Sequence, residues 1–392
     1  MPFALYVLAL AVFAQGTSEF MLSGLIPDLA RDLGVSVSAA GALTSAFAAG
    51  MVVGAPLTAV AGMRWPRRRA LLVLLAVFVL VHAAGALTTS FAVLLLTRVL
   101  AALANAGFLA VGLAAAMAMV PPDAKGRATS VLLGGVTLAC VAGVPAGAAL
   151  GQAFGWRAAF WAVALVSLPA LYAILRAVPA DRGPRPVRVR ARDELRALRD
   201  PRLLLTLLLA ALVNAATFCA FTYLAPLVTD VAGLPAAWVP AVLALFGIGS
   251  FAGVTASGRL SDTRPGTLLT GGGLALLAGW ALLAATAGSP VAALPLVLVQ
   301  GALAFAVGSA LITRALYAAS GAPALGGSFA TAALNAGAVA GPALGGLALA
   351  AGLGYRSPSW VSAGLVAVAL AVAVLARTAL RPSPGEGAGA RT

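Results

Sequence analysis

Apolar residues in this sequence gather into long uninterrupted blocks, and no other feature restricts the fold as strongly. Hydrophobic residues make up 62% of the 392 residues and charged residues 9%, against about 25% charged in an ordinary soluble domain. Roughly twelve blocks reach the length of about 20 residues that a helix needs to cross a bilayer. They are 3–26, 39–61, 70–88, 91–119, 129–153, 158–176, 203–228, 238–258, 267–287, 291–313, 328–352 and 359–377. The sequence therefore predicts an all-α integral membrane protein with twelve transmembrane helices.

Basic residues are distributed unevenly among the segments that connect these blocks. If both termini lie in the cytoplasm, external loops hold only Arg31, Arg157 and Arg356, and Arg98 lies inside a block. All other basic residues then fall in cytoplasmic segments, as the positive-inside rule requires. We expect a multi-pass protein of the cell membrane with both termini cytoplasmic. The first block lacks a basic flank and is too long for a signal peptide, so we expect it to be retained as a helix.

A Pro- and Arg-rich segment divides the blocks into two sets of six. An offset of 199 residues also relates Pro27 to Pro226, Pro66 to Pro265 and Gly155 to Gly354. Repeated halves related by an axis along the membrane normal are a known transporter plan. We expect an N-terminal six-helix half at 1–178, a cytoplasmic basic linker at 179–202, a C-terminal six-helix half at 203–380 and a cytoplasmic tail at 381–392.

The scarcity of lysine, histidine and cysteine argues against several classes of enzyme and metal site. The single lysine, Lys125, follows an alanine, so the Gly-Lys-Ser/Thr of a P-loop is absent. One histidine, His82, and two cysteines in apolar blocks do not make a metal site. We expect no metal, no cofactor and no enzymatic activity. The chain also lacks a basic surface with groove-reading elements, so we expect no nucleic-acid partner. Packing is the expected role of His82.

One carboxylate, Glu19, lies inside an apolar block. An acidic or basic residue at a helix centre in the bilayer costs about 2.5–3.5 kcal/mol on insertion scales. Chains that retain such a group typically use it to move protons or ions, so Glu19 is the first candidate for proton coupling. The alternative is a residue exposed to water near the outer mouth of a pore.

Arg98 in the fourth block is the basic counterpart of Glu19. If successive blocks cross in opposite directions, both lie about seven residues from the external end, or roughly 10 Å deep at 1.5 Å per residue. A nearby arginine favours the ionised form of Glu19, whereas apolar burial favours the protonated form. The pair is therefore a candidate proton-coupling device. Alternatively, Arg98 bonds backbone carbonyls as a structural partner.

Polar and aromatic side chains recur on single faces of several blocks. Gln15 and Ser23 share the face of Glu19, and Asn105 shares that of Arg98. Such faces should point at neighbouring helices or at a water-filled cavity, and hydrogen bonding between helices is the alternative to substrate contact. The candidate substrate-binding residues are Gln15, Asn105, Asn214, Phe218, Phe221, Tyr223 and Asn335. Their amides could bond a polar substrate group, and their rings could stack on an aromatic one.

These features together resemble the major facilitator superfamily. The segment LLLTRVLAALANAG around Arg98 resembles the fourth-helix motif of that superfamily, in which an arginine is implicated in proton coupling. The fifth block, GGVTLACVAGVPAGAALG, is similar to the antiporter motif of drug–proton exchangers, with matches at Gly134, Gly143, Pro145, Gly147 and Gly151. Residues 13–36 and 155–163 resemble the actinobacterial chloramphenicol-resistance permeases.

The loop after the second block departs from the family pattern. Met63 and Pro66 stand where an aspartate and a glycine are expected, while the basic part is kept. The second half retains the aspartate of this motif. The resemblance implies a cytoplasmic gate formed by Arg64, Arg67, Arg68 and Asp262. Alternatively, the arginines only set the topology.

The resemblance implies efflux of a small amphipathic antibiotic, with chloramphenicol as the expected substrate, in exchange for protons. It further implies alternating access by a monomer that contacts membrane lipid. The motifs specify antiport more firmly than they specify the drug. Proton-coupled transport of a sugar or another small metabolite is the first alternative. A membrane enzyme or a sensor that transports nothing is the second.

Overall fold

The computed structural model describes residues 2–62, 66–121, 125–178, 196–260, 265–319 and 326–379. Within these ranges every regular element is helical and no strand occurs. Twelve of the described helices are long and apolar enough to cross a membrane. The predicted all-α membrane fold with twelve spans is therefore confirmed.

The first bundle is built from the helices that precede residue 178. Its spans are α1 (Phe3–Phe20) with the 3₁₀ turn η1 (Met21–Gly24), α3 (Val37–Gly62), α4 (Arg67–Leu87), α5 (Phe91–Ala118), the series α6 (Lys125–Leu138), η3 (Ala139–Gly143) and α7 (Val144–Phe154), and α8 (Trp156–Ala177). The short helix α2 (Ile26–Asp32) joins the first two spans. Buried side chains such as Leu8, Phe47 and Phe108 form one apolar core inside this bundle.

The second bundle repeats this plan. The turn η4 (Arg196–Arg199) leads into α10 (Pro201–Thr222), which continues as α11 (Leu224–Pro226) and η5 (Leu227–Val231). After η6 (Ala236–Trp238) follow α12 (Val239–Leu260), α13 (Pro265–Thr286), α14 (Pro290–Ala318), α15 (Gly326–Ala350) and α16 (Ser357–Ala379). A second apolar core lies mainly within these helices and includes Leu276, Trp280 and Val366.

The 199-residue offset seen in the sequence recurs in the backbone. Helix α5 begins at residue 91 and α14 at residue 290. Two pairs of glycines with positive φ, Gly34 with Gly233 and Gly155 with Gly354, are separated by the same 199 residues. Glycine adopts positive φ without the steric cost that other residues meet. The chain therefore reverses at equivalent points of the two bundles.

Three of the blocks expected as continuous helices are interrupted. The first changes from α to 3₁₀ geometry after Phe20, so Ser23 does not continue the helical face of Glu19. In the fifth block the π-helical turn η3 ends two residues before Pro145, and the seventh block passes into the π-helical turn η5 directly after Pro226. Because proline lacks an N–H and its ring clashes with the preceding turn, it disrupts the regular α-helical ladder.

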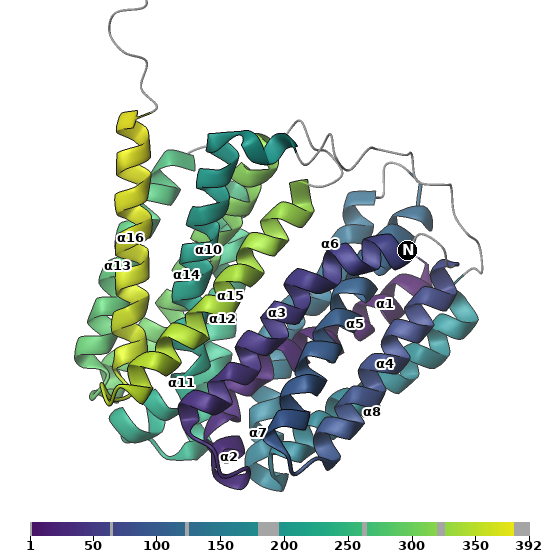
Figure 1. Ribbon diagram of the computed structural model, residues 1–392, viewed down its shortest axis with the longest axis horizontal. Coiled ribbons are helices and arrows are strands. Elements are labelled where there is room, and N and C mark those ends of the chain that lie inside the picture. The colour runs from purple at the N-terminus through teal and green to yellow at the C-terminus, as the bar shows by residue number, and fades with distance from the viewer. Residues whose placement is uncertain are drawn as a thin grey trace, which may run out of the picture.

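The two bundles pack against each other at one end of the molecule, near α2 and α11, and their helices diverge toward the end that holds the N-terminus and the end of α16 (Figure 1). At this closed end, the Ser38 hydroxyl donates to the Gly346 carbonyl at 2.6 Å and Ser45 donates to the Val339 carbonyl at 2.8 Å. Both bonds join α3 to α15. The bundles also pack closely between α12 and η3, where a Cβ atom at Gly247 would meet the Cys140 carbonyl.

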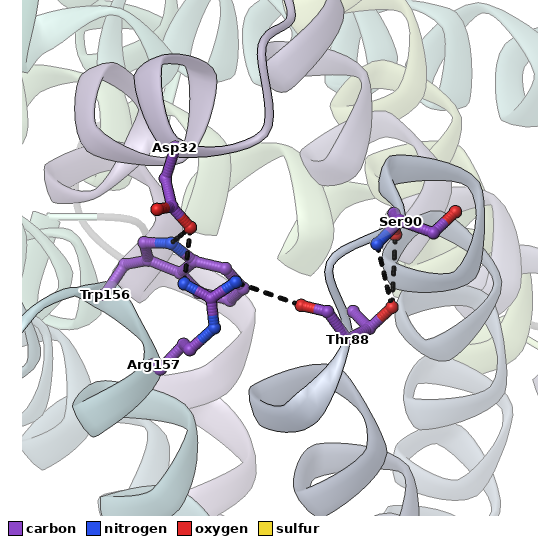
Figure 2. Close-up of polar contacts among 5 residues, drawn as sticks. All are labelled: Asp32, Thr88, Ser90, Trp156 and Arg157. Atoms are coloured by element: carbon purple, nitrogen blue, oxygen red, sulfur yellow. Dashed lines mark hydrogen bonds and ion pairs between the residues drawn. The ribbon is translucent and has the colours of Figure 1, made fainter.

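A separate cluster ties the loops of the first bundle at the closed end (Figure 2). The Trp156 indole donates to Oδ2 of Asp32 at 3.0 Å, and Arg157 bonds the same oxygen. Arg157 also donates to the Thr88 carbonyl at 3.1 Å. The bonds from Arg157 and then from Trp156 lower the pKa of Asp32 below its usual value. In the second bundle Arg356 donates to the Ala285 carbonyl at 3.0 Å.

Candidate functional site

Arg98 lies almost completely buried inside the first bundle, with 1% of its surface exposed. Its Nη1 donates to the Ser18 hydroxyl at 2.8 Å and its Nη2 donates to the Ser18 carbonyl at 2.7 Å. The carbonyl is in the last turn of α1, where carbonyls lack α-helical partners. The guanidinium also lies 4.4 Å from the centre of the Phe47 ring. The helix end in α1 thus supplies the acceptors that hold this buried cation.

His82 completes a directed chain of hydrogen bonds. Its Nδ1 lies 2.7 Å from the Phe78 carbonyl, and its Nε2 lies 2.6 Å from the Ser18 hydroxyl. A carbonyl can only accept, so the geometry assigns the ring proton to Nδ1 and makes Nε2 the acceptor. Ser18 then donates to His82 while it accepts from Arg98. His82 therefore has a polar contact with the buried network in addition to its packing against Phe78.

Glu19 follows Ser18 and lies at the edge of this network. Its carboxylate lies close enough to the Arg98 guanidinium and to the Asn105 side chain for both to favour its charged form. Cys140 of η3 lies close enough to Glu19 to interact electrostatically with its carboxylate. Glu19 is only partly exposed. The structure thus brings together one acid, one base and one amide that lie far apart in the sequence.

An aromatic pocket begins at the residue after Glu19. Phe20 of α1 lies 5.7 Å from Phe218 of α10, measured between ring centres, and Phe221 lies 4.6 Å from Phe246 of α12. Phe305 of α14 packs edge-on against Phe246. These rings enclose a small cavity of about 20 Å³ whose polar atoms come from Thr217, Ser250 and Cys140. Because both bundles line it, its shape depends on how the bundles are placed relative to each other.

The other predicted substrate-binding residues lie outside this pocket. Gln15 is 1% exposed, and neither polar atom of its side chain has a hydrogen-bond partner among the described residues. Asn214 donates to the Leu334 carbonyl at 2.6 Å, which joins α10 to α15. Asn335 donates to the Thr331 carbonyl within its own helix. Tyr223 is fully buried, and its hydroxyl donates to the Pro342 carbonyl at 2.8 Å. The bonds of Asn214 and Tyr223 join different helices, whereas the bond of Asn335 stays within α15.

The Gly/Pro-rich fifth span packs along the helix that carries Glu19. A Cβ atom at Gly143 would lie 2.0 Å from the Thr17 hydroxyl, and Cβ atoms at Gly147 and Gly151 would meet Met21 and Leu25. Gly134, chosen from the sequence, faces open space. Its neighbour Gly135 packs against α1, because a Cβ atom added at this position would lie 2.4 Å from the Ala9 carbonyl. Pro145 stands in the first turn of α7.

The predicted gate is only partly within the described residues. Arg67 and Arg68 begin α4 and are half-buried. Arg64 and Asp262 lie outside the described residues. In the part of the chain that the structure describes, no three His, Cys, Asp or Glu side chains gather as metal ligands.

The family follows from comparison of the sequence with known families. Residues 8–327 match the model of the Major Facilitator Superfamily. The chain belongs to this superfamily. Among its relatives, a chloramphenicol resistance protein of Streptomyces lividans is 59% identical over 97% of both chains. The inner membrane transport protein YdhP of Escherichia coli K12 is 35% identical over 90% of both chains.

Two solved transporter structures share the fold of this chain at low sequence identity. A bacterial homologue of the human lysosomal transporter Spinster, in an inward-facing and unoccupied conformation, aligns with a TM-score of 0.75 at 20% identity, over 97% of this chain and 98% of that chain. The nucleoside transporter NupG aligns with a TM-score of 0.76 at 13% identity, over 95% and 98%. At these identities the comparison establishes the fold of a Major Facilitator transporter.

Proposed function

We propose that this protein exports a small amphipathic antibiotic, with chloramphenicol as the first candidate, in exchange for protons. The observation that carries the proposal is the adjacency of two sites in the chain. Glu19 interacts with Arg98 and Asn105, and the next residue, Phe20, lines the aromatic pocket. The relation to a Streptomyces chloramphenicol resistance protein supports the choice of drug.

The chemistry of the pocket lining suits an aromatic molecule, and the volume of about 20 Å³ in this conformation must widen as the bundles move before a drug can enter. Phe218, Phe221 and Phe246 offer ring faces and edges, and offset or edge-to-face aromatic contacts add about 0.5–1.5 kcal/mol beyond the burial of apolar area. Thr217 and Ser250 add hydroxyl groups to the wall. A sugar site would need many more polar groups, so the lining favours the drug over the sugar alternative.

The contact between the two bundles supports a proposal of alternating access. In this structure the bundles are joined at the closed end by Ser38 and Ser45. If the termini are cytoplasmic, the closed end is external and the pocket is reached from the cytoplasm. Rocking of the bundles would break these two bonds and close the opposite end.

Glu19 provides a means of coupling that rocking to protons. Ionised Glu19 is attracted to Arg98, which Ser18 holds in place. A proton taken up from outside removes the attraction and frees the Asn105 amide. Release of this proton to the inside restores the attraction between Glu19 and Arg98 and the interaction with the Asn105 amide. Exchange of a neutral drug for one proton moves net charge, so the membrane potential should also drive export, by about 2.3 kcal/mol per charge per 100 mV.

The test is uptake of labelled chloramphenicol into inverted membrane vesicles with an imposed pH gradient. We expect accumulation by the wild type, loss of accumulation in Glu19→Gln, and no change in the control Asp28→Asn, which lies in a surface ion pair. Drug-for-drug counterflow should persist in Glu19→Gln, because the aromatic pocket is intact. Accumulation that survives in Glu19→Gln would remove Glu19 from coupling. Absence of accumulation in the wild type would reject chloramphenicol.

A further inference from the structure

A second and larger cavity lies inside the second bundle, between α10, α13, α14 and α16. Its volume is about 600 Å³, within the range of small-molecule sites. None of the residues that line the aromatic pocket contributes to it. Its wall is apolar and includes Leu209, Val213, Leu269, Val307, Val366 and Leu370.

Two arginines stand at one end of this cavity. Arg202 is the second residue of α10, and Arg314 lies in the last turns of α14, so both belong to the end opposite the closed end. Both are exposed. In the described parts of the chain neither guanidinium takes part in an ion pair or hydrogen bond, and no carboxylate lines the cavity.

The cavity extends from the arginines toward the middle of the bundle. Arg202 and Val213 both line it, and eleven residues of helix separate them, which is roughly 16 Å at 1.5 Å per residue. A long apolar slot with two cations at its mouth matches a molecule with a hydrocarbon chain and an anionic head.

We propose that this cavity holds an acyl chain of an anionic phospholipid whose phosphate binds Arg202 and Arg314. The planar guanidinium fork matches phosphate oxygens, and basic pockets between transmembrane helices are suited to anionic headgroups. The arginines disfavour a zwitterionic lipid because its ammonium group would approach two cations. Among the described residues, Tyr317 at the mouth is the one aromatic side chain that lines the cavity, which distinguishes this cavity from the drug pocket.

The site also explains why the second bundle tolerates so large a void in its interior. An empty cavity of this size would leave its lining without packing partners. A lipid chain drawn from the adjacent leaflet would supply them. The bound lipid would then be a structural part of the second bundle and would separate α10 from α16.

Photolabelling with a defined lipid tests this proposal. Phosphatidylglycerol with a diazirine at the end of one acyl chain is added to the purified full-length protein, and the labelled peptides are mapped. We expect labels on α10, α13, α14 and α16 near Val213, Val307 and Val366. Phosphatidylcholine with the same chain should label them weakly.

Two sets of variants separate the headgroup from the chain. Arg202→Gln with Arg314→Gln should weaken phosphatidylglycerol binding, measured by native mass spectrometry, by about 30-fold, since each basic residue contributes about 1 kcal/mol to anionic lipid binding. Arg67→Gln with Arg176→Gln removes the same charge at the same end of the first bundle and should change binding little. Val307→Trp should block labelling by filling the slot. Ala373→Phe, on another helix of the wall, is the second blocking variant if Val307→Trp unfolds.

Four outcomes would overturn the proposal. Equal labelling by phosphatidylcholine would remove the role of the arginines. Labels outside the four helices, or labelling that both blocking variants leave unchanged, would place the chain elsewhere. Displacement of either lipid by chloramphenicol would assign the cavity to the drug.

Discussion

Arg98 on α5 holds Ser18 on α1 at two points, its hydroxyl at 2.8 Å and its backbone carbonyl at 2.7 Å. The same hydroxyl lies 2.6 Å from His82 on α4. One serine thus links three helices of the first bundle. The contact also sets the position of Glu19, because Glu19 is the next residue of the chain.

Ser18→Ala should destabilise the protein more than loss of an ordinary buried hydroxyl. The change leaves Nη1 of Arg98 and Nε2 of His82 without their partner, and an unsatisfied buried polar group costs about 1–3 kcal/mol. Thermal unfolding in detergent measures the difference. Ser167→Ala is the control, because Ser167 is equally buried but bonds only the Val163 carbonyl of its own helix. Equal losses in the two variants would show that the network adds nothing to stability.

Gly135→Ala and Gly134→Ala should differ although the residues are neighbours. A Cβ atom at Gly135 would lie 2.4 Å from the Ala9 carbonyl, whereas one at Gly134 would meet nothing within 4 Å. Overpacking costs about 1–3 kcal/mol, and the gain of about 1 kcal/mol in helix propensity is common to both. We expect a lower midpoint of thermal unfolding for Gly135→Ala only. A lower midpoint for Gly134→Ala alone would contradict this packing of α6 on α1.

Ser38→Ala with Ser45→Ala should shift the protein away from the conformation described. Each change removes one bond between α3 and α15, and two bonds of about 0.5–1.5 kcal/mol change the ratio of conformations by about 5-fold to 150-fold. Spin labels at the exposed positions Phe154 and Leu353 report the separation of the bundles at the closed end. The long-distance population should grow.

The controls for the spin-label experiment are Thr255→Ala and Thr313→Ala, whose hydroxyls bond only their own helices. The background lacks Cys140 and Cys219, so that only the introduced cysteines are labelled. Distance distributions that are identical in the serine and threonine variants would argue against a role of these bonds in the seam.

Asp32→Asn should remove an acid-sensitive contribution to stability. Bonds from Arg157 and Trp156 lower the pKa of Asp32 in the folded protein, so its contribution is fully present above the unfolded carboxyl pKa of about 3.9. It is lost as the pH falls through the lower folded value. The pair is solvent-exposed, so we expect less than about 1 kcal/mol at neutral pH and less in high salt. Thermal unfolding between pH 3 and 7, roughly the window of these values, compares Asp32→Asn with Asp230→Asn. A difference from wild type that grows toward acid would show that the sign is wrong.

Much of the fold is readable from the sequence because the bilayer imposes a length on every apolar helix. The twelve spans were predicted for this reason. The 3₁₀ turn at Met21–Gly24 and the π-helical turns at Ala139–Gly143 and Leu227–Val231 were not predicted, because hydropathy records burial and says nothing about the hydrogen-bond pattern. Pro145 and Pro226 were the sequence features that could have indicated the two π-helical turns.

The polar residues of the site were easier to predict from the sequence than the apolar ones. Glu19, Arg98 and Asn105 stood out because charged and amide groups are rare in membrane helices, and the structure brings them together. Ser18 was missed, although it directly precedes Glu19, and the contact of His82 with Ser18 depends on packing between helices. Phe246 and Phe305 were not predicted as pocket residues, because a phenylalanine in an apolar block is typical of the hydrophobic core. The roles of all these residues in transport stay predictions.

The repeat of 199 residues has a consequence for how such a protein evolves. Ser18, Glu19 and Arg98 correspond at this offset to Thr217, Phe218 and Val297. At two of these three positions the first bundle has an ionisable residue, Glu19 or Arg98, and the second bundle has an apolar one. If Glu19 and Arg98 couple export to protons as proposed, selection for a new drug can change α10, α12 and α14 and leave that coupling in the first bundle intact. Variants selected with a different antibiotic should gather in the second copy.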